Sequence, residues 1–404
     1  MLGDILKKNI FLLLIVQIAN YALPLITLPY LLKVLGVYNY GIIAIYLAIV
    51  QYVFMVIDFG FSFISVRRAS VVRTEKFELS KIFTLTIASK AIIFIFIAIL
   101  CVVYVLFTDV EIYRYICIIA LITVFFNIFD TTWLFQAIEK LSFCTFFNVI
   151  SKTVYVILTF ILVKNQNDLI LALICYALSS ILSVVMSAVY IKITSLVSFT
   201  KIRWQEIKTL FLEGADIFLA NISISFYTTF NTILLGWLAG PLFVGYFSSA
   251  DKIRAAAQGL LNPVQQAMFP RVSKLIHEGV GINRIIACYG KWLILWGVLI
   301  TLGLLLLGRE FIFLYLGDGF DATANILMIL ALLPFGISVA IVYGPWWLAG
   351  RKKTKKYRGI YLTHSLLHCF YAVPLIYYYP MYGVAISIVL TEFLVAIRFY
   401  IERK

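Results

Sequence analysis

Residues 10–32 read IFLLLIVQIANYALPLITLPYLL, an apolar run that follows Lys7 and Lys8. A helix that crosses the roughly 30 Å hydrocarbon core of a bilayer needs about 20 residues, so this run is long enough to span. It is too long for the core of a signal peptide, and it lacks a small-x-small cleavage site. The run therefore predicts a first membrane-spanning helix.

The rest of the chain shares this apolar character. Of its 404 residues, 63% are hydrophobic and 13% are charged, and the mean hydropathy is +1.02. Soluble domains average about 45–50% apolar and about 25% charged residues, and no water-soluble fold could bury the excess. We therefore predict an all-α polytopic membrane protein. This excludes a soluble enzyme, a secreted disulfide scaffold and a single-span anchor.

Apolar windows and the placement of the cations together predict twelve transmembrane helices. The windows lie near 10–32, 40–62, 84–107, 113–136, 146–163, 169–191, 214–238, 243–271, 290–307, 322–348, 358–378 and 381–400. The eighth is rich in polar side chains, but if it did not cross, the run Arg351-Lys352-Lys353-Thr354-Lys355-Lys356 would face outward, against the positive-inside rule. With twelve spans, most of the 33 Lys and Arg residues and both termini lie on the cytoplasmic side. The net charge of +14 then reflects topology rather than nucleic-acid binding.

Two motifs recur in the halves of the chain at nearly the same spacing. They are Gly36-Val-Tyr-Asn-Tyr-Gly41 with Gly240-Pro-Leu-Phe-Val-Gly245, and Arg68-Ala-Ser70 with Arg271-Val-Ser273. An even number of spans separates the copies, so they share one orientation, as in transporters built from parallel repeats. We expect an N-terminal six-helix lobe at 1–191, a cytoplasmic linker at 192–210 and a C-terminal six-helix lobe at 211–404, around a central cavity.

Polar side chains form a stripe on each of four predicted spans. The stripes are Gln17, Asn20, Pro24 and Thr27; Gln51, Asp58, Ser62 and Ser65; Asp216, Ser223, Tyr227 and Asn231; and Asp251, Gln258, Asn262 and Gln265. A charge within hydrocarbon costs about 2.5–3.5 kcal/mol on insertion scales, so such groups face a cavity or a partner. We expect the four stripes to line the central cavity.

Individual charges within the spans have two interpretations each. Arg254 lies near the midplane of the eighth span and Lys252 lies half a turn outward; they either line the cavity or are neutralised by Asp251. Glu392 is also near the midplane, with no partner on its own helix.

A second group of charges lies toward the cytoplasmic side. Lys90 and Asp130 lie in the cytoplasmic thirds of the third and fourth spans, where they either pair or let Lys90 snorkel. Near them, Asp58, Arg67 and Arg68 are at the cytoplasmic mouth. The two arginines there either fix topology or capture an anionic headgroup.

Signatures of catalysis and cofactor binding are not found in the sequence. The six cysteines are scattered singly, without a C-x-x-C pair. His364 and His368 are four residues apart, but no third ligand accompanies them, so a metal site is not expected. There is no Walker A sequence. We expect no catalytic residue, no metal and no cofactor.

Several short stretches resemble bacterial polysaccharide flippases of the O-antigen translocase type. They are Gln17-Ile-Ala-Asn20-Tyr21-Ala-Leu-Pro24-Leu-Ile-Thr27-Leu-Pro29-Tyr30, Val34-Leu35-Gly36, Tyr40-Gly41, Asp58-Phe59-Gly60-Phe61 and Arg67-Arg68-Ala-Ser70, with Gly245-Tyr246-Phe247, Asp251-Lys252 and Pro270-Arg271 in the second half. These flippases belong to the multidrug, oligosaccharidyl-lipid and polysaccharide exporter superfamily. The resemblance implies two six-helix lobes that form a V.

The resemblance also implies a cargo and a location. The cargo would be an undecaprenyl-diphosphate-linked oligosaccharide, moved by alternating access to the periplasmic leaflet of the inner membrane for lipopolysaccharide or other surface polysaccharide synthesis. Partners would be membrane lipids, with a coupling ion (H+ or Na+) and the polysaccharide polymerase machinery left open. The implied cavity is cationic, with Arg254 and Lys252 as the deepest cations of the chain.

Two other functions remain as alternatives. A cation-coupled multidrug antiporter of the same superfamily would use a buried carboxylate such as Glu392 or Asp216 as its coupling site. An O-antigen polymerase or a membrane glycosyltransferase would need acidic clusters in long outer loops. The outer segment 308–321 has only about 14 residues, which argues against the enzyme.

Overall fold

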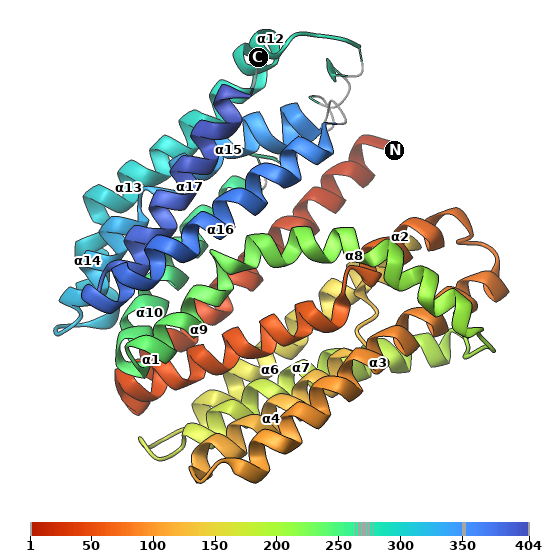
Figure 1. The fold of residues 1–404 in the computed structure, drawn as a ribbon, viewed down its shortest axis with the longest axis horizontal. Helices are drawn as coiled ribbons and strands as arrows, with labels where there is room; N and C mark the ends of the chain where they lie inside the picture. Colours follow the sequence, from red (N-terminus) through yellow and green to blue (C-terminus); the bar gives the residue numbers. More distant parts are fainter. Residues whose placement is uncertain are drawn as a thin grey trace. The chain divides into compact units, whose positions relative to one another are not determined.

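The chain folds into helices joined by short turns (Figure 1). The computed structural model describes the backbone of residues 2–262, 264–265, 268, 272, 275–276, 278–349 and 353–402, and within these ranges the side chains from Tyr21 onward except Leu141, Ile282, Ala349 and Thr354. Over these residues it contains no strand. The expected all-helical class is confirmed for this part of the chain.

The first seven helices cover the first half of the chain, and the others follow. The bounds are α1 Leu2–Asp58, α2 Phe61–Val71, α3 Lys76–Phe107, α4 Glu111–Asn127, α5 Thr132–Ala137, α6 Leu141–Leu162, α7 Leu169–Ile193, α8 Trp204–Phe226, α9 Thr229–Leu238, α10 Pro241–Gln258, α12 Ile282–Ile285, α13 Lys291–Leu316, α14 Asp321–Leu330, α15 Leu333–Ile341, α16 Thr354–Tyr378 and α17 Gly383–Ile401. Two π-helical stretches, η1 (Ile286–Gly290) and η2 (Val342–Ala349), precede α13 and follow α15.

Within the described residues, ten helices are long and apolar enough to cross a membrane. One of them, Tyr21–Asp58, covers parts of both the first and the second predicted span, because α1 continues through Gly36 with a break at φ +79°. Glycine alone adopts this conformation without strain, which is why a turn can interrupt the helix there. The 18-residue α10 is not among the ten. The chain is therefore a multi-pass membrane protein, and the number of twelve spans stays a prediction.

The helices form two compact units. Unit 1 comprises 1–23 and 46–222, and unit 2 comprises 24–45 and 223–404. The chain passes between the units inside α1, twice, and inside α8. The predicted lobes, 1–191 and 211–404, were drawn from the sequence repeat, and they stay a prediction beside these units.

In unit 1, α3, α4, α6 and α7 pack side by side, and α2 packs on α3 and α5 (Figure 1). The first half of α8 closes onto α2 through rings: Phe59 stacks on Phe218 with centroids 4.4 Å apart, and Phe61 meets Phe211 edge-on. Gly214 permits this approach, because a Cβ there would meet the carbonyl oxygen of Phe59.

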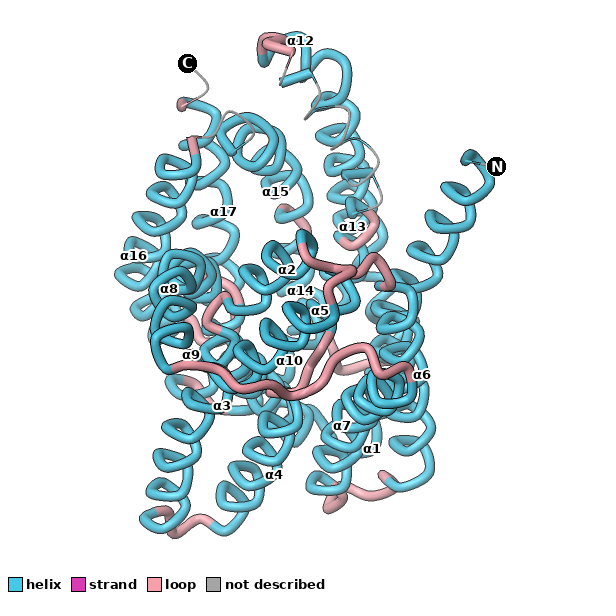
Figure 2. The backbone as a smooth tube through the Cα atoms, turned by 90° about the vertical axis from the view of Figure 1, so that its right-hand side faces the viewer, coloured by secondary structure: helices cyan, strands magenta, loops and turns pink. Residues whose placement is uncertain are grey.

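The predicted linker 192–210 is largely ordered against unit 1. It begins in the last residues of α7, and its part from Trp204 onward is already helical, as the first turns of α8. Between these helices it is irregular (Figure 2). The backbone N–H of Ser198 donates to Ser80 Oγ at 3.1 Å, and that of Thr200 donates to Thr84 Oγ1 at 3.0 Å. Two hydroxyls of α3 thus accept the hydrogen bonds of backbone N–H groups that lie outside helices.

In unit 2, α16 packs along α17, and α15 packs against both α13 and α17 (Figure 1). The core lies around η2, where Trp346, Trp347 and Phe399 are almost fully buried. These large rings come from the tenth and twelfth predicted spans. They make this unit densely packed around the end of α17.

The two Gly-x-x-x-x-Gly motifs of the repeat pack against each other within unit 2. Their first glycines, Gly36 and Gly240, have φ of +79° and +96°. Their second glycines interlock: a Cβ on Gly41 would overlap the carbonyl of Pro241, and a Cβ on Gly245 would overlap the carbonyl of Val37. The contact is reciprocal, as expected when two copies of one motif are related by a two-fold axis.

Candidate functional site

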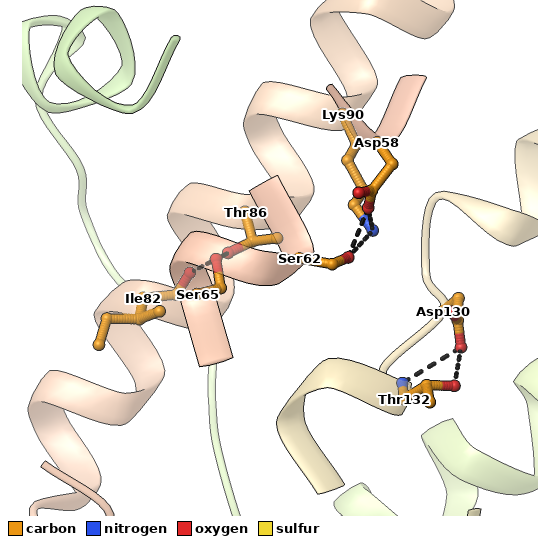
Figure 3. A network of polar contacts seen from close by, with 8 residues as sticks. All are labelled: Asp58, Ser62, Ser65, Ile82, Thr86, Lys90, Asp130 and Thr132. Carbon is orange, nitrogen blue, oxygen red and sulfur yellow. Dashed lines mark hydrogen bonds and ion pairs between the residues drawn. The ribbon is translucent and has the colours of Figure 1, made fainter. Parts of the chain in front are cut away.

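A buried ion pair joins α1 to α3 in unit 1 (Figure 3). Lys90 Nζ lies 2.9 Å from Asp58 Oδ1 and donates to Ser62 Oγ at 3.0 Å, while Ser62 Oγ donates to Asp58. The ring of Phe54 lies below the ammonium group, 5.7 Å from its nitrogen. The Lys90 side chain is 0% exposed and that of Asp58 is 20% exposed. Such a charge is tolerated within a span because its partner and two further contacts accompany it.

The predicted pairing of Lys90 with Asp130 was wrong, and so was the alternative that Lys90 snorkels, because its side chain is buried and pairs with Asp58. Asp130 instead accepts from the backbone N–H of Thr132 at 3.1 Å and from its hydroxyl at 2.6 Å, which fixes the turn that starts α5. Figure 3 shows Asp130 turned to Thr132, apart from the Lys90 group. The reason is local: an aspartate two residues before a helix start satisfies otherwise unpaired amide groups.

Ion pairs also tie together the ends of unit 1 that the sequence places at the cytoplasmic mouth. Arg68 contacts Glu213 of α8 at 2.8 Å, and Lys81 contacts Glu206 of the same helix at 2.6 Å. The neighbouring Arg67 is exposed. Arg68 therefore has a structural partner, whereas Arg67 is presented outward. Headgroup capture by this pair stays a prediction.

In unit 2, the polar face of α10 is built around Arg254. Its Nε donates to Asp251 Oδ1 at 3.0 Å, and its Nη1 donates to the Gln258 side chain. Helical spacing brings these three groups together, since residues three and four apart share a face. The Arg254 side chain is 14% exposed. The expected pairing with Asp251 is thus found; whether this face lines a cavity stays a prediction.

Lys252 lies on another face of the same helix. Its Nζ donates to the hydroxyl of Tyr40 at 3.1 Å and lies 5.4 Å from the centre of that ring. Tyr40 is buried and belongs to the first Gly-x-x-x-x-Gly motif. The lysine is therefore held by the motif contact. Of the two cations on α10, Arg254 is the one that shares a face with Asp251 and Gln258.

Glu392 is buried on α17, where it lies within electrostatic reach of Arg254 and Tyr227. Tyr357 and Tyr361 of α16 also interact electrostatically with the Glu392 carboxylate. The structure thus brings Arg254, Asp251 and Glu392 into one part of unit 2, from two helices far apart in sequence.

The remaining predicted site residues lie elsewhere. Asp216 is an exposed residue of α8 in unit 1. Gln17 and Asn20 lie on α1, and their side chains are outside the described residues. That the stripes of both units share one cavity stays a prediction.

One polar cluster was not predicted from the sequence as a unit. His368 of α16 bridges Asn231 of α9 and Thr391 of α17, and all three side chains are buried. The available signal was a histidine and an asparagine within apolar spans. Periodicity places each on a helix face but does not identify the facing helix.

Comparison with known proteins was made against this geometry. A family model described as polysaccharide biosynthesis protein matches residues 6–276. The chain belongs to this family. Two curated relatives resemble it over nearly their whole length, and both are named "Putative O-antigen transporter". One, from Shigella dysenteriae, is 34% identical over 97% of this chain and 98% of the relative. The other, from Escherichia coli strain K12, is 30% identical over 96% of this chain and 94% of the relative.

Solved structures of two transporters have the same fold as this chain. The lipid II flippase MurJ in an inward closed conformation matches with a TM-score of 0.76 at 16% identity, over 96% of this chain and 87% of that one. An inward-facing multidrug resistance MATE family transporter of the MOP superfamily matches with a TM-score of 0.73 at 13% identity, over 96% and 93%. The resemblance seen in the sequence is thereby confirmed at the level of family and fold.

Proposed function

We propose that this protein is a flippase that moves an undecaprenyl-diphosphate-linked oligosaccharide, an O-antigen repeat unit, from the cytoplasmic to the periplasmic leaflet. Full-length similarity to relatives named as O-antigen transporters supports the cargo class. The observation that carries the proposal is Arg254: a half-buried guanidinium on a membrane-embedded unit, held in a fixed orientation by Asp251 and Gln258.

The chemistry of Arg254 suits a diphosphate. A guanidinium presents five N–H donors in a planar fork that matches two phosphate oxygens, and it stays charged at every physiological pH. Asp251 occupies one edge of the fork. The bond to the neutral Gln258 is the one that an anionic ligand would replace, because an ionised oxygen adds charge attraction that the amide oxygen lacks. Asp251 then serves to aim the guanidinium.

Transport by this route breaks no covalent bond. The diphosphate and its sugars are held by Arg254 while the polyprenyl tail stays in the bilayer, and alternating access exposes the site to each side in turn. We place the protein in the bacterial inner membrane with both termini cytoplasmic, in agreement with the distribution of its cations. A coupling ion and a contact with the polysaccharide polymerase belong to this proposal as well. The protein is a transporter and no enzyme.

The test uses a strain that lacks the gene, supplied with wild-type or variant protein. Lipid-linked single repeat units that build up facing the cytoplasm without the gene, and clear with it, would establish flipping. Arg254→Glu should lower flipping by about tenfold or more, because a charge-assisted contact is lost and repulsion replaces it. The matched control is Arg309→Glu, a charge reversal at an exposed arginine of α13 that pairs with Asp321 at the start of α14.

Other outcomes would contradict the proposal in distinguishable ways. Repeat units that reach the periplasmic face but stay unpolymerised would favour a polymerase. Normal surface polysaccharide together with altered drug tolerance would favour an antiporter. Unchanged flipping by Arg254→Glu at equal protein level would remove Arg254 from the site while leaving the flippase function itself untouched.

A further inference from the structure

We propose that His368 is a proton-binding site of unit 2, and that a proton taken up at its Nδ1 alters the junction of α9, α16 and α17 and so makes transport depend on pH. His368 is 1% exposed, and its two partners, Asn231 and Thr391, are 0% exposed. The three side chains come from α9, α16 and α17, so the histidine connects three helices.

Hydrogen-bond geometry determines the protonation state of one of the two ring nitrogens. Asn231 Nδ2 donates to the carbonyl oxygen of Tyr227 at 2.9 Å, so its Oδ1 is the atom that faces the ring. His368 Nε2 lies 2.9 Å from that oxygen. An amide oxygen only accepts, so Nε2 must carry a proton. The neutral form of His368 therefore has its proton on Nε2 and leaves Nδ1 as an acceptor.

The other nitrogen faces a hydroxyl that serves both protonation states. Thr391 Oγ1 lies 2.6 Å from His368 Nδ1, 2.6 Å from the hydroxyl oxygen of Tyr371 and 2.6 Å from the carbonyl oxygen of Ser387. In the neutral state Thr391 donates to Nδ1. In the protonated state Nδ1–H donates to Thr391, whose own proton turns to the Ser387 carbonyl. Tyr371 donates to Thr391 in both states, so every polar atom stays satisfied without movement of a heavy atom.

The same chain of groups supplies a route for the proton. Tyr371 is half-buried, unlike the histidine. When the Thr391 proton moves to Nδ1, the Tyr371 proton moves to Thr391 and a proton from solvent replaces it on Tyr371. The two hydroxyls then rotate, so that Thr391 donates to the Ser387 carbonyl and Tyr371 again donates to Thr391. No net charge is left on either hydroxyl, and the only gain is one positive charge on the imidazole. Reversal of these steps releases the proton.

The groups around the imidazole determine what its charge does. Titratable or charged side chains close to the imidazole are Tyr371 and Cys369 on α16, Tyr227 just before α9, and Glu392 on α17. Tyr361 of α16 stacks on Tyr227, and Tyr400 of α17 packs against Tyr343 of η2. The Tyr371 and Tyr227 rings have their centres 5.4 Å and 6.3 Å from that of the imidazole. At 5.4 Å, the Tyr371 ring is within the roughly 6 Å over which an aromatic ring attracts a cation. Glu392, the residue after Thr391, is the acidic group in reach of Tyr227.

Proton uptake strengthens the connection between helices. Bonds from an imidazolium to Asn231 and Thr391 are charge-assisted and about twice as strong as those from the neutral ring. They hold the start of α9 to α16 and α17. The helix α9 follows a break in regular structure at Tyr227–Thr228, shortly after the chain enters unit 2. Protonation therefore anchors the first element of unit 2 after that crossing.

The first experiment observes the proton itself and does not depend on any transport function. The chain has three histidines, so 15N- and 13C-labelled histidine in nanodisc-embedded protein gives few signals, which His364→Gln and His368→Gln assign. We expect His368 to carry its lone proton on Nε2 at pH 8 and to gain a second on Nδ1 on acidification. A lone proton on Nδ1, or a neutral ring throughout, would overturn the proposal. Thr391→Val should change the titration of His368, and Thr391→Ser, which keeps the hydroxyl, should restore it.

The second experiment rests on the proposed function and measures transport. Flipping of a fluorescent undecaprenyl-diphosphate-linked sugar in proteoliposomes should change by about fivefold between pH 8 and pH 5 in the wild type, the lower end of typical coupling between two sites. His368→Gln, or His368→Asn if the former folds poorly, should flatten this profile. His364→Gln is the matched control: it lies one turn away on α16 and its ring bonds to its own helix at Ile360. A flat wild-type profile would overturn the coupling, whereas no flipping at any pH would overturn the proposed function and leave the proton site to the labelled histidines.

Discussion

The buried charge of Lys90 is held by partners on other helices. Lys90 is 0% exposed and is contacted by Asp58, Ser62 and Phe54, all from the segment that precedes α3. The sequence placed Lys90 within a span but not beside Asp58, because helical periodicity gives the direction of a side chain and not its neighbour. The cost of burial is offset in such a case only when both charges remain, since either one alone would stay unpaired in apolar surroundings.

Removal of the Lys90 charge alone should therefore lower the free energy of unfolding more than removal of both charges of the pair. We expect Lys90→Met to lower the free energy of unfolding in detergent by about 3–5 kcal/mol, because it leaves the Asp58 carboxylate without its cation. The double variant Lys90→Met with Asp58→Asn should recover most of this loss. Chemical denaturation followed by tryptophan fluorescence measures both. Equal losses for the single and double variants would show that Lys90 acts through packing alone.

Asp168 is a second residue whose role depends on its charge, this time outside the spans. It precedes α7, and its carboxylate accepts from the backbone N–H groups of Lys164 and Asn165, both at 2.8 Å. These bonds favour the ionised form and hold the pKa of Asp168 below its usual value. The stabilisation is therefore present above the unfolded pKa and is lost as the pH falls through the lowered folded pKa.

Hydrogen exchange should report this loss at two amides. On acidification, the N–H groups of Lys164 and Asn165 should lose protection relative to the amides inside α7. Asp168→Ala should abolish their protection at neutral pH already. Unaltered protection at these two positions in the variant would mean that the turn is held by other contacts.

At the scale of elements, the two copies of the sequence repeat form turns that contact each other. Gly36 and Gly240 are the breaks of two equivalent turns, and Gly41 and Gly245 are the points where those turns interlock. Equivalent residues of the repeat thus meet in space, whereas the spacing alone predicted only that the two copies share one orientation. The cluster of His368, Asn231 and Thr391 had no such repeat to reveal it, since its members lie on three helices and up to 160 residues apart. Sequence pattern predicts elements and their internal geometry; contacts between elements depend on packing that no local pattern contains.

The interlocked turns should not tolerate a methyl group. Gly41→Ala would drive its Cβ into the carbonyl of Pro241, and backbone moves less readily than a side chain. We expect a loss of about 3 kcal/mol, the upper range for overpacking. Gly303→Ala in α13 is the control, because a Cβ there meets nothing within 4 Å and alanine favours a helix. Thermal unfolding of the two variants in the same detergent decides: equal midpoints would contradict the close contact.

For the whole molecule, the number of membrane spans depends on whether α10 crosses the bilayer. Ten described helices qualify as spans by length and composition, and α10, with Asp251, Lys252 and Arg254, is not among them. Charge placement nevertheless predicts that it crosses, since otherwise the cationic run that starts at Arg351 would face outward. The polar side chains that weaken its hydropathy are those that bind each other and Tyr40. An element with internal partners for its charges can cross where a hydropathy scan excludes it.

Cysteine accessibility tests this directly in a variant whose six native cysteines are replaced. Ala239→Cys, just before α10, should react with an impermeant thiol reagent from outside, and Gly281→Cys, beyond the segment 243–271, should react only after the membrane is opened. Asn165→Cys and Lys353→Cys serve as the outer and inner references, since twelve spans place them on opposite sides. If Ala239→Cys and Gly281→Cys react from one side, α10 does not cross. Arg254 would then lie outside the membrane, and the proposed diphosphate site would lose the buried position on which it depends.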